Sequence, residues 1–187
     1  GLIGLPLPGV DARIVALDDP KRELPPGEVG EMAVRGPNVF AGYWNRPAEN
    51  AAAFVDGWFL TGDNGWMDGQ GYFTLVDRRK NMILSGGFNV YPAQIEQAIY
   101  EHPAVAECIV IGVPDAYRGQ AAKAFCSLKP GAAPFTLEQL RTFLGDRLGK
   151  HELPSALEIR ENLPRSAAGK LMAATLRDEE AARAAQQ

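Results

Sequence analysis

The 187-residue sequence predicts an α+β fold, in which a small β-rich subdomain precedes a compact α/β domain with helices packed on a small sheet. Residues 1–77 hold short runs with alternating apolar positions, separated by turns rich in proline and glycine. Later residues alternate strand-like runs with segments of helical spacing. The net charge is −4 over residues 1–79 and zero over residues 80–187, which supports a boundary at Lys80.

Residues 1–60 are predicted to form several short strands and one helix. Asp11–Leu17 and Glu31–Arg35 place apolar side chains at alternate positions, as a half-buried strand does. Pro47–Phe54 is predicted to be a short helix, because proline is favoured in a first helical turn. Asp56-Gly57 then forms a turn before the apolar residues Trp58-Phe59-Leu60.

The middle of the sequence concentrates charges and glycines around two short strands. Tyr72–Val76 has strand composition and leads into the charged segment Asp77–Lys80, and the apolar run Met82–Leu84 ends close to Gly86-Gly87. Adjacent glycines permit a positive φ and a close approach of the backbone to a ligand. Taken alone, Gly86-Gly87 is typical of a hairpin turn, and Thr61-Gly62-Asp63 of a turn or cap.

The second half is predicted to follow the order ββαββαβα. Its first helix is indicated by Ile95 and Ile99, which fall on one helical face, and its second by Thr136, a capping residue placed three before Gln139. After the strand at Met82–Leu84, the elements are a helix from Pro92 to His102-Pro103, strands Val105–Val113 and Ala121–Leu128, a helix after Thr136, a strand Ala156–Ile159 and a helix Leu171–Ala185.

Composition argues against several classes of protein. A net charge of −4 gives no footprint for nucleic acid or an anionic membrane, and no apolar run approaches the roughly 20 residues of a membrane span. The N-terminus lacks the pattern of a signal peptide. Cys108 and Cys126 lie in apolar runs, so we predict buried free thiols and a reducing, cytoplasmic setting. With His102 and His151 far apart, no metal cluster is visible.

A long ordered series of motifs resembles the adenylate-forming enzymes, which include acyl-CoA synthetases, adenylation domains and firefly luciferase. The resemblance covers nearly the whole chain and is strongest to bacterial fatty-acid–CoA ligases. It implies that residues 1–79 are the tail of the large ATP- and acyl-binding domain, and that residues 80–187 are a mobile C-terminal domain that docks on it. The segments that carry it are GLPLPG (4–9), PGEVGE (26–31), GYWNRP (42–47), TGD (61–63), GYFTLVDRRK (71–80), MILSGGFNVYP (82–92) and LPRSAAGK (163–170).

The resemblance also implies a reaction and a set of site residues. A carboxylic acid, in this case a fatty acid, attacks the α-phosphate of ATP to give an acyl-adenylate, and the thiol of CoA then displaces AMP. Asp63 and Arg78 match nucleotide-binding positions, and Lys80 matches the hinge between the two half-reactions. Gly86-Gly87 matches the lining of the pantetheine channel. Mg²⁺ is expected with ATP through the missing N-terminal region, without which the fragment is expected to be inactive.

Lys170 is the candidate catalytic residue. The first half-reaction needs a cation where carboxylate and phosphate meet, because charge develops there in the transition state. A compact ammonium on a long stem suits that contact, and Ser166-Ala-Ala-Gly169 is predicted to be a mobile hairpin that carries it. Without the resemblance, Lys170 would be read as a surface lysine. The segment is not a P-loop, since Leu171 stands where that motif needs Ser or Thr.

Two other functions remain open at this stage. The chain could belong to an adenylation module that loads the phosphopantetheine arm of a carrier protein, or it could be a non-catalytic module. Arg165 stands where the family usually has lysine, and Met172-Ala173 and Glu152 stand where basic residues are common. The loss of those basic residues bears on how the phosphates of CoA are bound.

Overall fold

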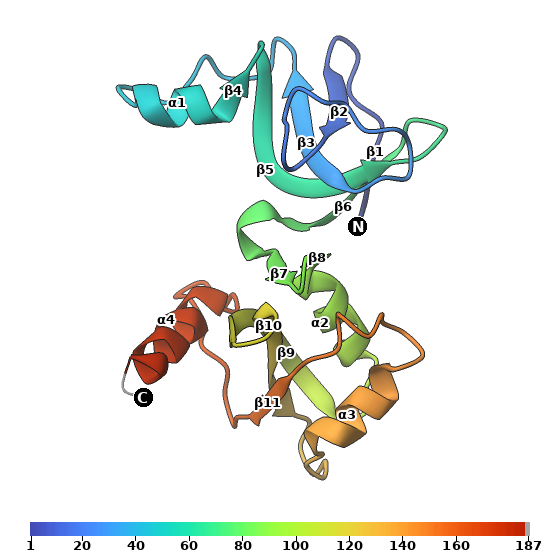
Figure 1. Cartoon of the computed structure of the whole chain (residues 1–187), viewed down its shortest axis with the longest axis vertical. Helices are drawn as coiled ribbons and strands as arrows, with labels where there is room; N and C mark the ends of the chain where they lie inside the picture. Colours follow the sequence, from blue (N-terminus) through green and yellow to red (C-terminus); the bar gives the residue numbers. More distant parts are fainter. Residues whose placement is uncertain (186–187) are drawn as a thin grey trace. The chain divides into compact units, whose positions relative to one another are not determined.

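The computed structural model describes residues 1–185, which form two compact units, one ending at Lys80 and the other beginning at Asn81 (Figure 1). Each unit has a sheet of its own, and the helices and strands together give the α+β fold class that the sequence predicts. No helix in this part of the chain is both long and apolar enough to cross a lipid bilayer.

The first unit is an antiparallel sheet in the order β1-β6-β5-β3-β2, with β4 paired to β5. A small core of Ile14, Ala16, Leu24 and Phe73 lies against it. The elements are β1 (Leu2–Gly4), β2 (Asp11–Val15), β3 (Gly30–Arg35), α1 (Pro47–Ala53), β4 (Phe54–Val55), β5 (Trp58–Met67) and β6 (Phe73–Arg78), followed by the 3₁₀ turn η1 (Arg79–Asn81).

The turn interpretation of Thr61-Gly62-Asp63 is wrong, because all three residues lie inside the long strand β5. The strand is irregular at this point. Its register against β3 shifts between Glu31 and Ala33, and its register against β6 shifts between Asn64 and Gly65. Gly62 has a φ of +73°, a value that favours glycine. The segment is therefore a distorted stretch of sheet.

The second unit has the order ββαββαβα and is arranged around one strand, β10. Its second strand, β8 (Phe88–Val90), was not predicted, and the predicted strand Tyr72–Val76 lies in the first unit as β6. Strand β10 pairs with β9 along one edge, and along the other with β7 at Gly119 and with β11 at Lys123–Cys126. Only the β10–β11 pair is parallel among the strands of the described chain. The elements are β7 (Ile83–Ser85), β8 (Phe88–Val90), α2 (Pro92–Tyr100), β9 (Val105–Asp115), β10 (Gly119–Leu128), α3 (Leu137–Leu144), β11 (Ala156–Ile159) and α4 (Ala173–Ala184).

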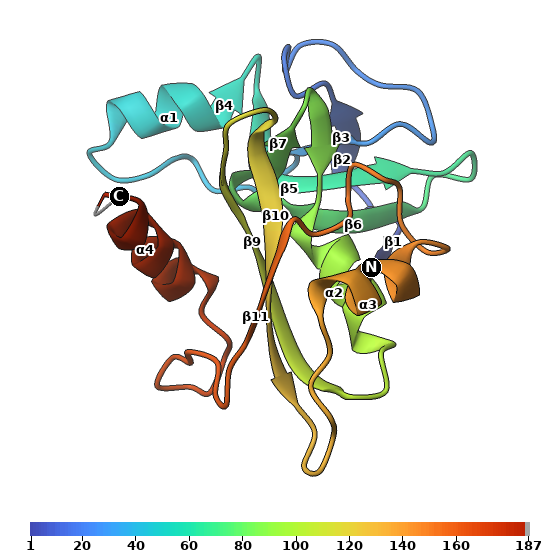
Figure 2. The ribbon, with the colours of Figure 1, turned by 60° about the horizontal axis from the view of Figure 1, so that its bottom comes forward.

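Alternation along β9 builds two cores, one on each face of the sheet. Cys108 and Val110 join a cluster with α2 and α3, whereas Ile109 and Ile111 join a cluster with α4. Within this unit, α2 and α3 cover one side of β9 and β10 and α4 covers the other (Figures 1 and 2). On α4, as described, only Leu176 is buried. This helix therefore depends on polar contacts to stay on the sheet.

Two sequence predictions have simple outcomes in this unit. The terminal helix begins at Ala173 and not at Leu171, because Leu171 pairs with Arg165 in a β-bridge and the Met172 N–H donates to the Pro164 carbonyl. Cys108 and Cys126 are free and buried as predicted, and they face each other across β9 and β10 with 3.8 Å between sulfurs. The contact with Cys126, together with burial, raises the pKa of Cys108 well above its ordinary value.

Candidate functional site

The structure brings Asp63 and Arg78 together. They are register partners on β5 and β6, and Arg78 Nε lies 2.9 Å from Asp63 Oδ1. The Asp63 side chain is half-buried and that of Arg78 is exposed. Both line a hollow of about 300 Å³ together with Gly1 and Leu75–Asp77. A carboxylate and a guanidinium thus lie side by side at an open surface, where a polar ligand can reach them.

A buried carboxylate missed by the sequence analysis lies close to this pair in the sheet. Glu31, on β3, is 3% exposed and accepts a hydrogen bond from the Gly62 N–H at 3.0 Å. It also forms an ion pair with Arg79, whose guanidinium donates to the Leu17 carbonyl at 2.8 Å. Polar residues at alternating positions of a strand normally face solvent. The glutamate in the strand-like run of residues 31–35 therefore does not indicate, from the sequence, that its side chain is buried.

Lys80 lies in η1 and is exposed, and it is the last residue of the first unit. The boundary between the compact units thus falls between Lys80 and Asn81. No strand ladder joins the two sheets in the described residues.

Gly86-Gly87 forms the turn of the β7–β8 hairpin, as the hairpin interpretation predicts. Both residues have positive φ, +58° and +85°, as a tight two-residue hairpin turn requires. A Cβ built at either position meets no atom within 4 Å, so the turn is open on its outer side. The Gly86 N–H donates to the Arg118 carbonyl, which ties the hairpin to the β9–β10 loop.

A hollow of about 320 Å³ lies beside this turn and holds two cations, Arg118 and Lys150. Its aromatic residues include Phe88 and His151, whose rings stack with centroids 4.5 Å apart. Ser85 also lines it, and among the described residues its buried hydroxyl has no hydrogen-bond partner. Arg118 and Lys150 were not identified from the sequence, and they supply positive charge to this hollow.

Lys170 is carried by a tight hairpin between Arg165 and Leu171. The Ser166 N–H donates to the Lys170 carbonyl and the Gly169 N–H to the Ser166 carbonyl, each at 2.8 Å. Arg165 fixes the hairpin through an ion pair with Glu107 on β9 and a hydrogen bond to the Gly169 carbonyl. Lys170 itself is exposed. A well-anchored backbone therefore presents this ammonium to solvent.

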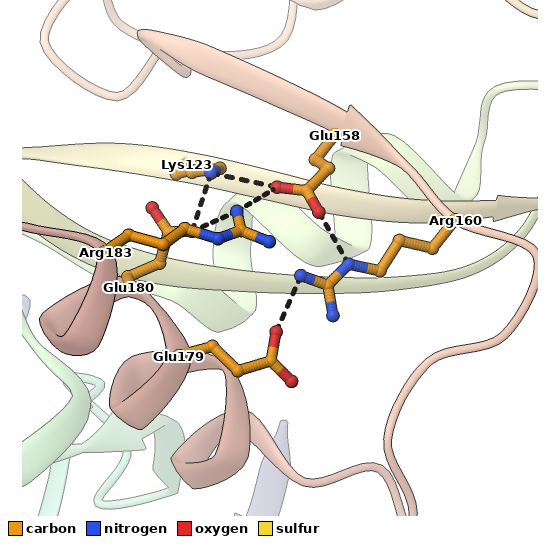
Figure 3. A network of polar contacts seen from close by, with 6 residues as sticks. All are labelled: Lys123, Glu158, Arg160, Glu179, Glu180 and Arg183. Atoms are coloured by element: carbon orange, nitrogen blue, oxygen red, sulfur yellow. Dashed lines mark hydrogen bonds and ion pairs between the residues drawn. The ribbon is translucent and has the colours of Figure 1, made fainter. Parts of the chain in front are cut away.

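A network of charges holds α4, the helix that follows Lys170, on the sheet (Figure 3). Lys123 on β10 has a side chain only 13% exposed and lies 3.0 Å from Glu158 and 2.9 Å from Glu180. Burial alone would raise the pKa of Glu158, but hydrogen bonds from Arg183, Lys123 and Arg160 outweigh it and lower the pKa to about 2. The network is completed by Arg160–Glu158, Arg160–Glu179, Arg183–Glu158 and Arg183–Glu180.

The predicted site residues are thus divided between the units. Asp63, Arg78 and Lys80 lie in the first, whereas Gly86-Gly87 and Lys170 lie on separate hairpins of the second. In the described part of the chain, no group of three or more His, Cys, Asp or Glu side chains is arranged to hold a metal ion.

Comparison with known families matches two segments of the chain. Residues 1–44 match the family model described as AMP-binding enzyme, and residues 94–170 match the one described as AMP-binding enzyme C-terminal domain. The second match contains the Lys170 hairpin, α3, β9, β10, β11 and most of α2.

Curated relatives match along almost the whole chain. The long-chain-fatty-acid–CoA ligase of Bacillus subtilis is 47% identical over 180 residues, which are 96% of this chain and 32% of that protein. Feruloyl-CoA synthase of an Amycolatopsis species is 42% identical over 178 residues, covering 95% of this chain and 35% of that protein. The chain therefore spans about one third of the length of the curated relatives it matches.

Solved structures give the same result for the fold. ATP-bound MatB from Rhodopseudomonas palustris superimposes with a TM-score of 0.87 at 39% identity, covering 96% of this chain and 35% of that one. The o-succinylbenzoate CoA synthetase of Bacillus subtilis, in complex with its acyl-adenylate intermediate, gives a TM-score of 0.84 at 38% identity, with coverage of 95% and 36%.

Proposed function

We propose that this chain, whose residues 1–44 and 94–170 belong to the AMP-binding enzyme family, is the C-terminal part of an acyl-CoA ligase. Because the chain spans about a third of its curated relatives, the activity belongs to a longer protein that also contains the ATP- and acyl-binding regions. The isolated chain is inactive in this proposal. Residues 80–187 act as a mobile domain that docks on the preceding one.

The proposed reaction has two steps, adenylation of the acid and transfer of the acyl group to CoA. A carboxylate oxygen of the acid attacks the α-phosphorus of ATP, and pyrophosphate leaves with the electrons of the broken P–O bond. The thiol sulfur of CoA then attacks the acyl carbon, its proton is lost, and AMP leaves. Negative charge builds up around the α-phosphate in the first step, so a cation held there lowers the barrier.

The observation that carries the proposal is the exposed Lys170 on its anchored hairpin. Arg165 is occupied by Glu107 and the Gly169 carbonyl, so the hairpin is held while the Lys170 ammonium is accessible to an anionic ligand. In the proposed first step, Lys170 contacts the carboxylate and the α-phosphate oxygens together. Its long stem lets one point charge reach both groups.

Asp63 and Arg78 bind the nucleotide in this proposal. The Asp63 carboxylate accepts hydrogen bonds from two ribose hydroxyls, and Arg78 holds that carboxylate in place across the ladder at 2.9 Å. Relatives of known structure were determined with ATP or with an acyl-adenylate, which supports a nucleotide as a ligand of the longer protein. In this proposal Mg²⁺ accompanies ATP and is held through the N-terminal region of the longer protein.

CoA is the acceptor that the second unit favours. Its phosphates are anionic, and the hollow beside Gly86-Gly87 offers Arg118 and Lys150 together with the Phe88–His151 stack. The open glycine turn leaves room for a narrow pantetheine arm. Lys80 is the proposed hinge that brings this surface to the acyl-adenylate after the first step. The buried free thiols Cys108 and Cys126 suit a reducing compartment, and we place the ligase in the cytoplasm.

The acid is proposed to be a fatty acid, because long-chain-fatty-acid–CoA ligases are among the relatives with the higher identities, 47% and 43% in two of them. The test is pyrophosphate release by the full-length protein across a panel of fatty, aromatic and amino acids, with and without CoA. Release that depends on a fatty acid, with an acyl-CoA product, is the expected result. Release without consumption of CoA moves the assignment to carrier-protein loading, and no release with any acid contradicts the ligase assignment.

A further inference from the structure

Glu31 is a charged side chain buried inside the first unit. Its side chain is 4% exposed, and a carboxylate is buried at a cost unless it is paired and hydrogen-bonded. Both of its oxygens are used: Oε1 accepts from the Gly62 N–H at 3.0 Å, and Oε2 pairs with the Arg79 guanidinium. The two donors come from different elements, Gly62 from β5 and Arg79 from η1.

The two donors are sequence neighbours of the proposed nucleotide-binding residues Asp63 and Arg78. Gly62 directly precedes Asp63, and Arg79 directly follows Arg78. Asp63 and Arg78 are themselves register partners. The sequence neighbours of the Asp63–Arg78 pair therefore converge on one buried side chain, which lies on a third strand, β3.

The backbone of β5 is irregular around Gly62, where the Glu31 side chain binds. Gly62 has a φ of +73°, and the register of β5 against β3 passes from Asn64 directly to Leu60, so Gly62 has no register partner on β3 within the described ladder. A second polar link supports it, since Thr61 Oγ1 donates to the Met32 carbonyl and accepts from the Asp63 N–H. The carboxylate of Glu31 accepts a hydrogen bond from the Gly62 N–H where the β3–β5 ladder shifts register.

We propose that Glu31 is a positioning residue for the nucleotide site, acting through Gly62 on Asp63 and through Arg79 on Arg78. The inference rests on the proposed function, because it gives Glu31 a role only if Asp63 and Arg78 bind the nucleotide. Arg79 also directly precedes Lys80, so the same carboxylate fixes the end of the first unit at the proposed hinge.

The test is a set of variants in the full-length ligase, assayed for the KM of each substrate. Glu31→Gln keeps the shape and one acceptor oxygen but removes the charge that pairs with Arg79. We expect the KM for ATP to rise about tenfold, in line with the loss of a hydrogen bond to a charged group, and the KM for the acid to stay constant. Glu28→Gln, in the turn just before the same strand but exposed, is the matched control and leaves both KM values unchanged.

Two further variants separate positioning from general stability. If Glu31 acts through Arg79, adding Arg79→Gln to Glu31→Gln causes less extra loss than Arg79→Gln causes alone. Arg79→Gln alone also tests the link should Glu31→Gln fail to fold. An equal rise in the KM for ATP and for the acid, or a lower melting temperature with both KM values unchanged, overturns the inference.

Asp63→Ala distinguishes this inference from the proposed function. If Asp63→Ala leaves the KM for ATP unchanged, the nucleotide assignment is wrong and the role of Glu31 goes with it. If Asp63→Ala raises that KM while neither Glu31→Gln nor Arg79→Gln does, only the positioning role is wrong.

Discussion

Arg78 and Asp63 form an ion pair across β5 and β6, with 2.9 Å between Nε and Oδ1. The Arg78 side chain is 62% exposed, and ion pairs in such positions contribute about 0–1 kcal/mol to stability. Removal of either side chain should therefore leave the fold intact. A change in activity on removal then reports on a ligand and not on folding, which makes this pair well suited to mutagenesis.

The first prediction concerns this pair. Asp63→Ala in the full-length ligase should raise the KM for ATP by about tenfold or more, because hydrogen bonds from the ribose hydroxyls to a charged acceptor are lost. Steady-state kinetics of pyrophosphate release measures the change. Asp11→Ala is the control, since Asp11 forms a comparable exposed ion pair with Arg35 at 2.8 Å in the same unit. Equal effects of both substitutions would contradict a nucleotide role for Asp63.

Lys170→Ala tests the catalytic assignment. The variant should lose acyl-adenylate formation, because no cation remains where the carboxylate meets the α-phosphate. Thioester formation from supplied acyl-adenylate should be retained, and single-turnover assays of each half-reaction measure the two steps separately. Lys129→Ala, an exposed lysine after β10, is the control. Equal loss of both half-reactions in Lys170→Ala would refute the assignment.

Lys80→Pro tests the hinge. The proline ring fixes the φ angle and so restricts the backbone at the boundary between the two units. Adenylation should be spared and thioester formation impaired, as measured by the two single-turnover assays. Lys80→Ala removes the same side chain without restricting the backbone and should leave both steps near normal. An unaffected thioester step in Lys80→Pro counts against the hinge.

Gly87→Val tests the pantetheine channel. A Cβ at residue 87 meets no protein atom within 4 Å, so the side chain projects into open space, and the positive φ of +85° costs about 1–2 kcal/mol. The KM for CoA should rise while adenylation stays unchanged. Gly131→Val is a matched control with a φ of +77° and an equally open Cβ position in the loop before α3. A similar rise in the KM for CoA from both variants would attribute it to strain.

Glu158→Gln tests the charge network that holds α4. The pKa of Glu158 is lowered from 4.5 to about 2, so the charged form stabilises the fold above the unfolded pKa, and this contribution is lost as pH falls towards 2. At pH 7 the variant should lose roughly 2–3 kcal/mol of unfolding free energy. The difference from the unchanged chain should shrink between about pH 4.5 and 2, as measured by urea unfolding. Glu161→Gln, at an exposed position, should show neither effect.

The sequence predicts the second unit better than the first. Its helices are set by local patterns, namely the Thr136–Gln139 capping box and the buried Ile95 and Ile99, and these patterns act over short distances along the chain. The continuous strand through Thr61-Gly62-Asp63 was missed, because partners on β3 and β6 override the local preference for a turn.

Some residues of the candidate site could be identified from the sequence, and others only from the structure. Lys170, Asp63 and Arg78 could be named from their motifs, and the structure adds which of them meet. Glu31 lies in the segment PGEVGE (26–31) but was not singled out, and Arg118 and Lys150 were not named as site residues, because what distinguishes these residues is burial or neighbours distant in the sequence. An acidic residue in a strand stands out as a candidate site residue only once the structure shows that its side chain is buried.

β10 connects two hairpins that lie near opposite ends of the second unit's sequence. It pairs with β7, the first strand of the Gly86-Gly87 hairpin, and also with β9, to which Arg165 ties the Lys170 hairpin through Glu107. Both hairpins are therefore attached to the same pair of strands, β9 and β10. If Lys80 is the hinge, as proposed, a pivot there would turn both hairpins through the same angle, and the timing of the two proposed steps would then depend on a single coordinate and not on two loops that close independently.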